Sequence, residues 1–210
     1  MLKVNDMEIA WFGHDSFRIK GEGQVIYIDP WKLSSAQKAT LVLVTHEHYD
    51  HCSPEDVESV SGKNTLIVTA QDCAKKLKGT VKVLAPGQSL TAGSVHVEAV
   101  AAYNIDKGFH KKESGWLGFV LTIGKTRIYH AGDTDLIPEM RHLKAITVAL
   151  LPVSGTYVMT AEQAAEAARA IGAEISVPMH FGEIVGSQGD AERFKALCEG
   201  LRVEILEKES

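Results

Sequence analysis

The chain has 210 residues, of which 45% are hydrophobic, and a formal net charge of −5. Its length and composition indicate a globular protein, and we expect residues 1–210 to form a single domain. No segment approaches the roughly 20 apolar residues of a membrane-spanning helix, and the N-terminus has no apolar stretch after a basic start, so we expect a cytoplasmic protein without membrane contact. The acidic balance argues against nucleic-acid partners, whose phosphates require clustered Lys and Arg.

Short strands joined by tight turns are predicted for the first part of the chain. Runs rich in β-branched and aromatic residues are separated by glycines, and they cover residues 7–11, 17–20 and 24–28. Asp29-Pro30 ends the third run, because proline cannot continue a hydrogen-bonded ladder. A further apolar strand begins at Leu41 and stops at Thr45.

The segment after this strand carries the strongest signal in the sequence. Three imidazoles and a carboxylate follow within six positions: His46, His48, Asp50 and His51. The helical HExxH zinc motif is excluded, because Asp50 stands four residues after His46. In an extended segment, residues two apart point the same way, so His46 and His48 can converge on one ion while Asp50 and His51 face another. Since four ligands so close in sequence crowd one tetrahedral centre, we expect two neighbouring metal ions.

The middle of the chain alternates strands with short helices. Ser53 is the expected N-cap of a helix, with Pro54 at its first position. Strands are predicted at residues 65–69, 81–84 and 95–101, a hairpin at 116–123 and 126–129, and short helices at 71–77 and 136–143.

The last third of the chain begins with a buried strand predicted at residues 147–153. Thr160 and Gln163 form the capping box that opens the clearest helix, residues 161–171, and Gly172 closes it. A strand, a helix and a second strand complete the chain at residues 174–178, 190–199 and 202–206. Strands dominate the first part of the chain, and strands alternate with helices in the last part. This order indicates sheets covered by helices.

Two metal ions need more ligands than residues 46–51 supply. Candidates beside predicted strands are His110, Asp133 and His180. Asp133 follows an apolar strand at a glycine-containing turn, a common place for a carboxylate that must reach a site. His180 likewise ends a strand.

These motifs resemble those of the metallo-β-lactamase superfamily. Residues 45–51, THEHYDH, have its HxHxDH form, Gly132-Asp133-Thr134 resembles its bridging-aspartate motif, and His180 its late histidine. Residues 11–14 (WFGH), 28–30 (IDP), 129–135 (YHAGDTD) and 178–180 (PMH) resemble one branch, the small metal-dependent hydrolases related to ascorbate-6-phosphate lactonase. The resemblance implies an α/β (α+β) fold, a four-layer αββα sandwich with the metals at one edge between two sheets.

The resemblance also implies two divalent ions and their ligands. The first ion would bind to His46, His48 and His110, the second to Asp50, His51 and His180, and Asp133 would bridge them. Zinc is the expected metal, while manganese, iron or nickel could bind the same side chains. Zinc lowers the pKa of bound water from 15.7 to about 7, so a hydroxide shared between the ions can attack a carbonyl or phosphorus. Asp50 would orient that hydroxide or accept its proton.

Three further polar residues are candidates for supporting roles. His14 follows the first predicted strand and is either a turn residue or a substrate contact or proton donor. His130 precedes the Asp133 turn and either supports the ligands or points away. Asp29 is expected to hydrogen-bond a ligand histidine and fix its tautomer.

We therefore expect a hydrolase that cleaves a lactone, ester or phosphoester in a small, anionic molecule. Three lysines flank His110, and they either form a solvated face or steer such a substrate electrostatically: Lys107, Lys111 and Lys112. The alternative is a mononuclear iron redox enzyme resembling persulfide dioxygenases, and a nuclease is disfavoured by the length and acidic charge of the chain. The sequence leaves the substrate and the oligomeric state open, a homo-oligomer included.

Overall fold

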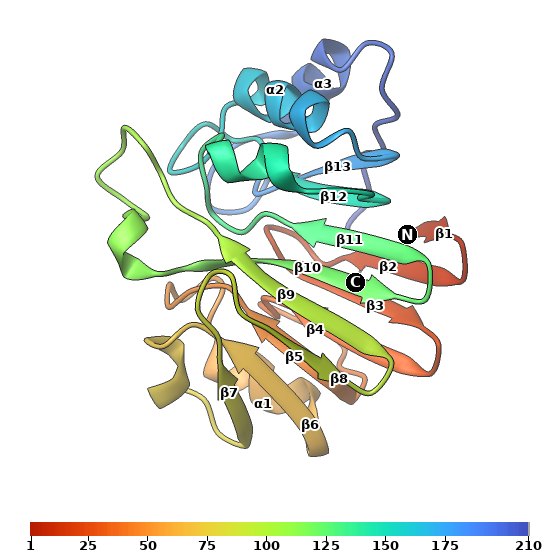
Figure 1. Cartoon of the computed structure of the whole chain (residues 1–210), viewed down its shortest axis with the longest axis vertical. Coiled ribbons are helices and arrows are strands. Elements are labelled where there is room, and N and C mark those ends of the chain that lie inside the picture. The colour runs from red at the N-terminus through yellow and green to blue at the C-terminus, as the bar shows by residue number, and fades with distance from the viewer. Residues whose placement is uncertain (210) are drawn as a thin grey trace.

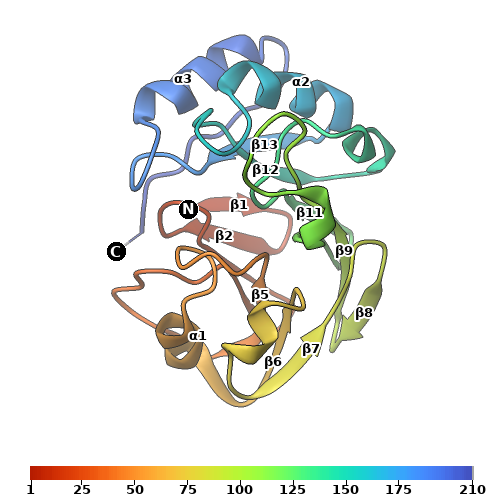
Figure 2. The ribbon, with the colours of Figure 1, turned by 90° about the vertical axis from the view of Figure 1, so that its left-hand side faces the viewer.

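Two β-sheets pack face to face and carry helices on their outer sides in the computed structural model, which describes residues 1–209 (Figure 1). Figure 2 shows α2 (Ala161–Ile171) and α3 (Gln188–Leu197) at one end of this stack and α1 (Pro54–Val60) at the other. The layers run helix, sheet, sheet, helix, so the prediction of a four-layer αββα sandwich is confirmed.

The first sheet has seven strands in the order of the sequence. Its first four strands pair antiparallel, and the pairs from the fourth to the seventh are parallel. The strands are β1 (Leu2–Val4), β2 (Met7–Trp11), β3 (Phe17–Gly21), β4 (Gln24–Ile28), β5 (Ala39–Val44), β6 (Ser61–Thr69) and β7 (Thr80–Val83).

The second sheet has six strands in the order β13-β12-β11-β10-β9-β8. The pairs from β8 to β11 are antiparallel, and β11, β12 and β13 are parallel to one another. The strands are β8 (Ser89–Ala92), β9 (Val95–Ala101), β10 (Leu117–Ile123), β11 (Thr126–His130), β12 (Val148–Pro152) and β13 (Ile175–Met179). The hairpin predicted around Gly124-Lys125 is confirmed as β10 and β11.

The core lies mainly between the sheets. Its largest fully buried side chains include Phe17 and Leu43 from the first sheet and Phe119 and Tyr129 from the second. All residues of β5 except Thr40 are buried, because the strand has a parallel neighbour on each side and protein on both faces. This burial explains why residues 41–44 form a continuous apolar run rather than an alternating one.

The predicted helix ends are confirmed. Ser53 Oγ accepts the backbone N–H of Asp56 at the start of α1. In α2, Thr160 Oγ1 accepts the N–H of Gln163 at 3.2 Å, and Gln163 Oε1 accepts the N–H of Thr160 at 2.9 Å. Gly172 closes α2 with φ +65°, a backbone conformation that favours glycine.

Other local predictions were wrong. The helices expected at 71–77 and 136–143 are short 3₁₀ segments, η1 (Cys73–Lys75) and η3 (Pro138–His142), because so few residues cannot offset the cost of nucleating an α-helix. Residues 202–206 make only one bridge, Ser176 with Val203, before the chain leaves the sheet edge. The sequence also missed β1 and β8, two edge strands whose partly exposed residues form no apolar run.

The two sheets are joined at one edge, where parallel strands of both sheets end. The backbone N–H of Leu117, at the start of β10, donates to the carbonyl of Thr45, directly after β5, at 3.1 Å. The long connection between β9 and β10, residues 102–116, contains η2 (Lys112–Ser114) and lies at the left of Figure 1. None of the helices formed by residues 1–209 is long and apolar enough to cross a membrane.

Candidate metal centre

Two groups of histidine and aspartate side chains meet at this edge. In each group, one nitrogen or oxygen atom per residue lies within 4.8 Å of the corresponding atoms of the others. The first group comprises His46, His48, His110 and Asp133, and the second comprises His14, Asp15, His51 and His180. The first group contains the side chains predicted for the first metal ion. The second group shares His51 and His180 with the prediction but adds His14 and Asp15.

Strained backbone positions hold several of these side chains. His14, His110 and His180 have φ angles of +49°, +52° and +60°, a region that residues other than glycine adopt rarely. Gly132, directly before Asp133, has φ +64°, and a Cβ atom there would lie 2.6 Å from the carbonyl oxygen of Leu117. Such conformations cost free energy and concentrate at functional sites, where the surrounding structure enforces them.

Asp133 lies between the two groups. Its Oδ2 is 3.1 Å from Nε2 of His110, in the first group, and 3.3 Å from Nε2 of His180, in the second. Its Oδ1 is 3.5 Å from Nε2 of His51. One carboxylate therefore faces both groups, which is the position that the predicted bridging role requires.

Asp29 fixes the Nδ1 atoms of two candidate ligands, His51 by a direct hydrogen bond and His46 through the Thr45 hydroxyl. The buried Asp29 carboxylate accepts hydrogen bonds from His51 Nδ1 at 2.8 Å, from the N–H of Thr45 at 2.8 Å and from Thr45 Oγ1 at 2.6 Å. Because the Thr45 hydroxyl donates to Asp29, it accepts from His46 Nδ1 at 2.9 Å. Both imidazoles thus carry a proton on Nδ1 and direct Nε2 into the centre. Asp29 makes the contact that its predicted role requires.

The same orientation holds for His110 and His180. His110 Nδ1 donates to the backbone carbonyl of Tyr157 at 3.1 Å, and His180 Nδ1 donates to Ser154 Oγ at 3.0 Å. In the first group, His46 Nε2 lies 3.0 Å from His48 Nδ1, so two nitrogen atoms of neighbouring ligands face one another. Four imidazoles therefore direct Nε2, and His48 directs Nδ1, toward the interior of the centre.

Buried polar atoms without hydrogen-bond partners gather here. Among the described residues, eleven such side-chain atoms occur, and six belong to this centre: His14 Nδ1, Asp15 Oδ1 and Oδ2, His51 Nε2, His110 Nε2 and Asp133 Oδ1. Leaving a buried polar atom unpaired is costly, so native proteins rarely do it without a ligand. Imidazole and carboxylate donors are those that zinc, manganese and iron accept, and the residues present fit such an ion in each group.

Electrostatic coupling between the side chains of this centre is strong. Burial disfavours the charged form of Asp133, but His180 and His51 outweigh it and hold its pKa well below the ordinary value. Burial also opposes charge on His180, yet Asp133 and Asp15 raise its pKa to about 9. For Asp15, burial itself is the largest effect and raises the pKa well above the usual range. A divalent ion that binds here would therefore displace protons.

Asp50 and His14 form a pair beside the second group. Asp50 Oδ2 lies 3.0 Å from His14 Nε2 and 3.7 Å from His51 Nε2, and its carboxylate is partly exposed. The structure thus places Asp50 near the second group, but its nearest partner is His14. His14 is buried, and its ring centroid is 4.1 Å from that of His180.

His130 points away from the cavity. Its Nε2 donates to the backbone carbonyl of Asp15 at 3.0 Å, and its Nδ1 accepts the N–H of Gly132 at 3.2 Å. Both ring nitrogens are bound to backbone groups and the side chain is fully buried, so His130 cannot contact a substrate. It instead supports the turns that present Asp15 and Asp133.

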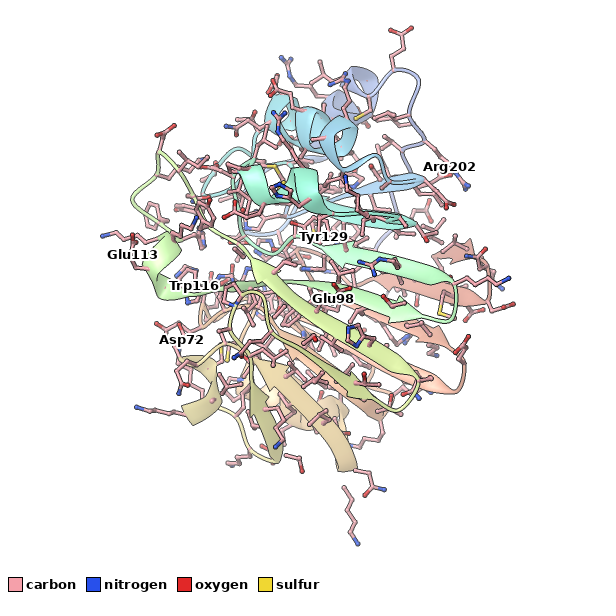
Figure 3. The ribbon with its side chains drawn as sticks, in the orientation of Figure 1. Asp72, Glu98, Glu113, Trp116, Tyr129 and Arg202 are labelled. Carbon is pink, nitrogen blue, oxygen red and sulfur yellow. The ribbon has the colours of Figure 1, made fainter. Side chains whose placement is uncertain are left out.

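Trp116 forms a wall beside the first group. Its ring centroid lies 4.6 Å from that of His46, and its Nε1 donates to Asp72 Oδ2 at 2.5 Å. Figure 3 shows Trp116 and Asp72 at the same edge of the molecule, on segments that are far apart in the sequence. The contact fixes the indole against the imidazole, so it restricts the rotation of a candidate ligand.

Both groups open into a cavity of about 260 Å³. Histidine and aspartate side chains form its floor, and apolar side chains surround its mouth: Tyr49, Phe109, Tyr157, Ile184 and Val185. Tyr49 and Phe109 are 67% and 54% exposed, unusually high values for large apolar side chains. Neither Lys nor Arg occurs among the described residues that line the cavity.

The sequence missed Asp15 and this apolar mouth. Asp15 directly follows residues 11–14, which the resemblance had singled out, but an aspartate in a turn is common and gave no signal of its own. The mouth residues come from segments separated by up to 136 positions, from Tyr49 to Val185, so no local pattern relates them.

Known proteins resemble this chain over nearly its whole length. The family model described as Beta-lactamase superfamily domain matches residues 8–180. A UPF0173 metal-dependent hydrolase of Thermoplasma acidophilum is 35% identical over 93% of this chain and 92% of its own. A solved structure from Parabacteroides distasonis, described as a metal-dependent hydrolase, is 34% identical with a TM-score of 0.85, covering 97% of this chain and 94% of its own. A metallo hydrolase of Ignicoccus hospitalis has a TM-score of 0.80 and 27% identity, over 97% of this chain and 96% of its own.

Proposed function

Because this chain belongs to the metallo-β-lactamase superfamily, among its UPF0173 metal-dependent hydrolases, we propose that it hydrolyses a lactone or ester bond in a small molecule with an apolar group, using two divalent metal ions. One observation carries this proposal: a single cavity joins the two ligand groups at its floor to a ring of apolar side chains at its mouth. The closer relation to ascorbate-6-phosphate lactonase stays a prediction.

The apolar mouth favours an apolar substrate group over the anionic substrate that the sequence suggested. A group of large apolar side chains exposed together on one surface marks a binding site in many proteins. Of the seven described residues of this kind, four line the cavity: Tyr49, Phe109, Tyr157 and Ile184. An acyl chain or an apolar ring of the substrate would pack against these side chains and bury them.

Two of the three lysines near His110 form ion pairs with acidic side chains outside the cavity. Lys107 forms an ion pair with Asp135, and Lys112 Nζ donates to Glu139 Oε1 at 3.0 Å. Neither lysine lines the cavity. A phosphoester would therefore meet no cationic side chain at the mouth, which makes a neutral carboxylic ester or lactone the better fit.

Bound divalent ions would supply water with a pKa near 7 and would polarise the carbonyl oxygen of the substrate. The side chains of the protein would position the ions and their ligands. Asp133 lies between both groups and holds them at a fixed separation, while Asp29 and the Thr45 hydroxyl keep two ligand imidazoles in the tautomer that leaves Nε2 free.

Proton transfer in this proposal runs through Asp50. The Asp50 side chain is partly exposed and lines the cavity, and its Oδ2 is bound to His14 Nε2, so the carboxylate can accept the proton of the attacking water. Opening the ester or lactone then produces an alkoxide that requires a proton, and the Asp50–His14 pair can return it. The mouth holds the apolar group and keeps the reacting carbonyl at the floor.

A substrate screen with metal analysis tests the proposal. Purified protein is loaded with zinc or manganese and offered acyl lactones, p-nitrophenyl acetate, p-nitrophenyl octanoate and bis-p-nitrophenyl phosphate. We expect turnover that depends on metal and is highest for the lactone or ester with the longer apolar chain. Preference for the phosphodiester, or oxygen consumption by an iron-loaded sample without hydrolysis, would contradict the proposal and favour the phosphoesterase or redox alternative.

A further inference from the structure

We propose that Asp15 is a ligand of the second metal ion, together with His51 and His180. This inference rests on the proposed function only in requiring that the centre binds two ions. The sequence had assigned the carboxylate of this ion to Asp50 and had given Asp15 no role.

The loop that carries Asp15 is tightly fixed. Between β2 and β3, Ser16 N donates to the carbonyl of Gly13 at 3.0 Å, and Phe12 N donates to that of Ser16 at 2.8 Å. The Asp15 carbonyl accepts from His130 Nε2 at 3.0 Å, so a buried side chain of the second sheet holds this residue from behind. These contacts leave the Asp15 side chain little freedom to turn away from the centre.

The Asp15 carboxylate has no hydrogen-bond partner. Its side chain is fully buried, and neither Oδ1 nor Oδ2 is bound by any described residue. A carboxylate removed from water without a partner is strongly unfavourable, whereas a bound cation compensates it. Unpaired oxygens on a rigid, buried loop beside two histidines therefore indicate a cation-binding site.

The distances to the neighbouring imidazoles fit a shared ion. Asp15 Oδ2 lies 3.5 Å from His51 Nε2 and 3.9 Å from His180 Nε2. These separations are too long for good hydrogen bonds. Two ligand atoms bound to one ion at ~2.1 Å with a tetrahedral angle are about 3.4 Å apart.

The outer hydrogen bonds of the two imidazoles determine which ring nitrogen faces Asp15. His51 Nδ1 donates to Asp29, and His180 Nδ1 donates to Ser154 Oγ. Once their Nε2 protons are displaced, both Nε2 atoms present lone pairs to the Asp15 carboxylate, which also offers only lone pairs. A cation between them removes this conflict.

Asp50 is differently placed. Its Oδ2 is already bound to His14 Nε2 at 3.0 Å, and its side chain is partly exposed to the cavity. The second ion would thus have two buried carboxylate ligands, Asp15 and the shared Asp133. The first ion, with three histidines, would have only Asp133. Carboxylate-rich sites suit harder ions, so the second site should bind manganese better than the first site does.

Metal titration of the metal-free protein tests this assignment. Mn²⁺ and Zn²⁺ binding to wild type, Asp15→Asn and Asp135→Asn is measured by calorimetry and by elemental analysis after dialysis. Asp135 is a matched control, because it is also a buried aspartate but lies in neither ligand group. Circular dichroism and thermal unfolding check that each variant is folded.

We expect wild type and Asp135→Asn to bind two ions, and Asp15→Asn to keep one and to bind the second at least tenfold more weakly. Asp15→Glu, which keeps a carboxylate, should restore part of this loss, whereas a purely structural role would not favour Glu over Asn. Unchanged affinity for the second ion in folded Asp15→Asn would overturn the assignment while leaving the proposed function intact. Wild type that binds fewer than two ions would instead count against the proposed function.

Discussion

Asp29 Oδ2 lies 2.8 Å from Nδ1 of His51, and this contact connects the end of β4 to the ligand-bearing loop that follows β5. Asp29 follows β4 with φ +44°, and His51 lies in the loop after β5. The two residues are neighbours because β4 and β5 pair parallel, so their carboxyl ends lie side by side. Asp29 thereby determines which nitrogen of His51 faces the interior of the centre.

Substitution Asp29→Asn should weaken metal binding. The amide keeps the size of the side chain but loses the charge that holds the Nδ1 proton of His51, and loss of such a supporting contact typically costs about 10–100-fold in metal affinity. Competition with a coloured chelator measures the affinity. Affinity equal to wild type would show that the tautomer of His51 is fixed by other means.

Substitution His48→Ala should abolish hydrolysis without unfolding the protein. His48 belongs to the first ligand group and is only half-buried, so its removal costs little core packing. We expect kcat/KM to fall more than about a hundredfold, as for loss of a metal contact. Glu47→Ala is the matched control, because Glu47 is adjacent but pairs with Lys76 on the surface. Full turnover by folded His48→Ala would exclude the first site from the mechanism.

Substitution Phe109→Ala should impair binding of apolar substrates selectively. Phe109 is 54% exposed at the mouth, and burying such a surface contributes about 1–1.5 kcal/mol, which corresponds to roughly a tenfold rise in KM. The effect should appear for p-nitrophenyl octanoate and be small for the acetate. Ile105→Ala serves as the control, since Ile105 is equally exposed but does not line the cavity. Equal effects of both substitutions would show that the apolar side chains at the mouth do not bind the substrate.

The metal-free protein should lose stability as the pH rises from about 6.5 to 9. The pKa of His180 is raised to about 9 in the fold, against ~6.5 in an unfolded chain. The folded state therefore favours the protonated ring, and this contribution is complete below pH ~6.5 and lost as the pH passes about 9, a difference of about 3 kcal/mol. His51, whose pKa Asp133 and Asp29 raise against the effect of burial, acts in the same direction.

Urea unfolding across this pH range measures the effect. The metal-loaded protein should show a smaller decrease, because a bound ion replaces the proton on Nε2. Constant stability of the metal-free protein between pH ~7 and ~9 would contradict the charged state inferred for His180.

Substitution Gly132→Ala should destabilise the protein more than Gly172→Ala. Both glycines have φ near +65°, so alanine at either position introduces backbone strain of about 1–2 kcal/mol. Only at Gly132 would the new Cβ also meet a backbone carbonyl, at 2.6 Å, whereas nothing lies within 4 Å at Gly172. Thermal unfolding compares the two, and Gly132→Ala should also lose metal because Asp133 would shift. Equal losses of stability would mean that the loop around Gly132 relaxes freely.

Much of the fold follows from local patterns in the sequence. Residues 7–11, 24–28 and 95–101 were predicted as strands with their observed ends, and the capping box at Thr160 predicted the start of α2. These signals are local, because side-chain alternation and capping involve residues within a few positions. The edge strands β1 and β8 escaped prediction, and the strand predicted at residues 202–206 is only a single bridge at Val203, since strand pairing depends on partners elsewhere in the chain.

The sequence by itself determined the family and the clustered ligands of residues 46–51, because a strand end brings these side chains together without any distant contact. It also named His110, Asp133 and His180 as candidates beside predicted strands, and the resemblance assigned each of them to an ion. Tertiary structure alone decided that Asp133 lies between two groups, that Asp15 enters the second and that His130 is directed at the backbone. Each of these facts depends on distances between loops of two different sheets, and such distances are fixed only when the sheets pack against one another.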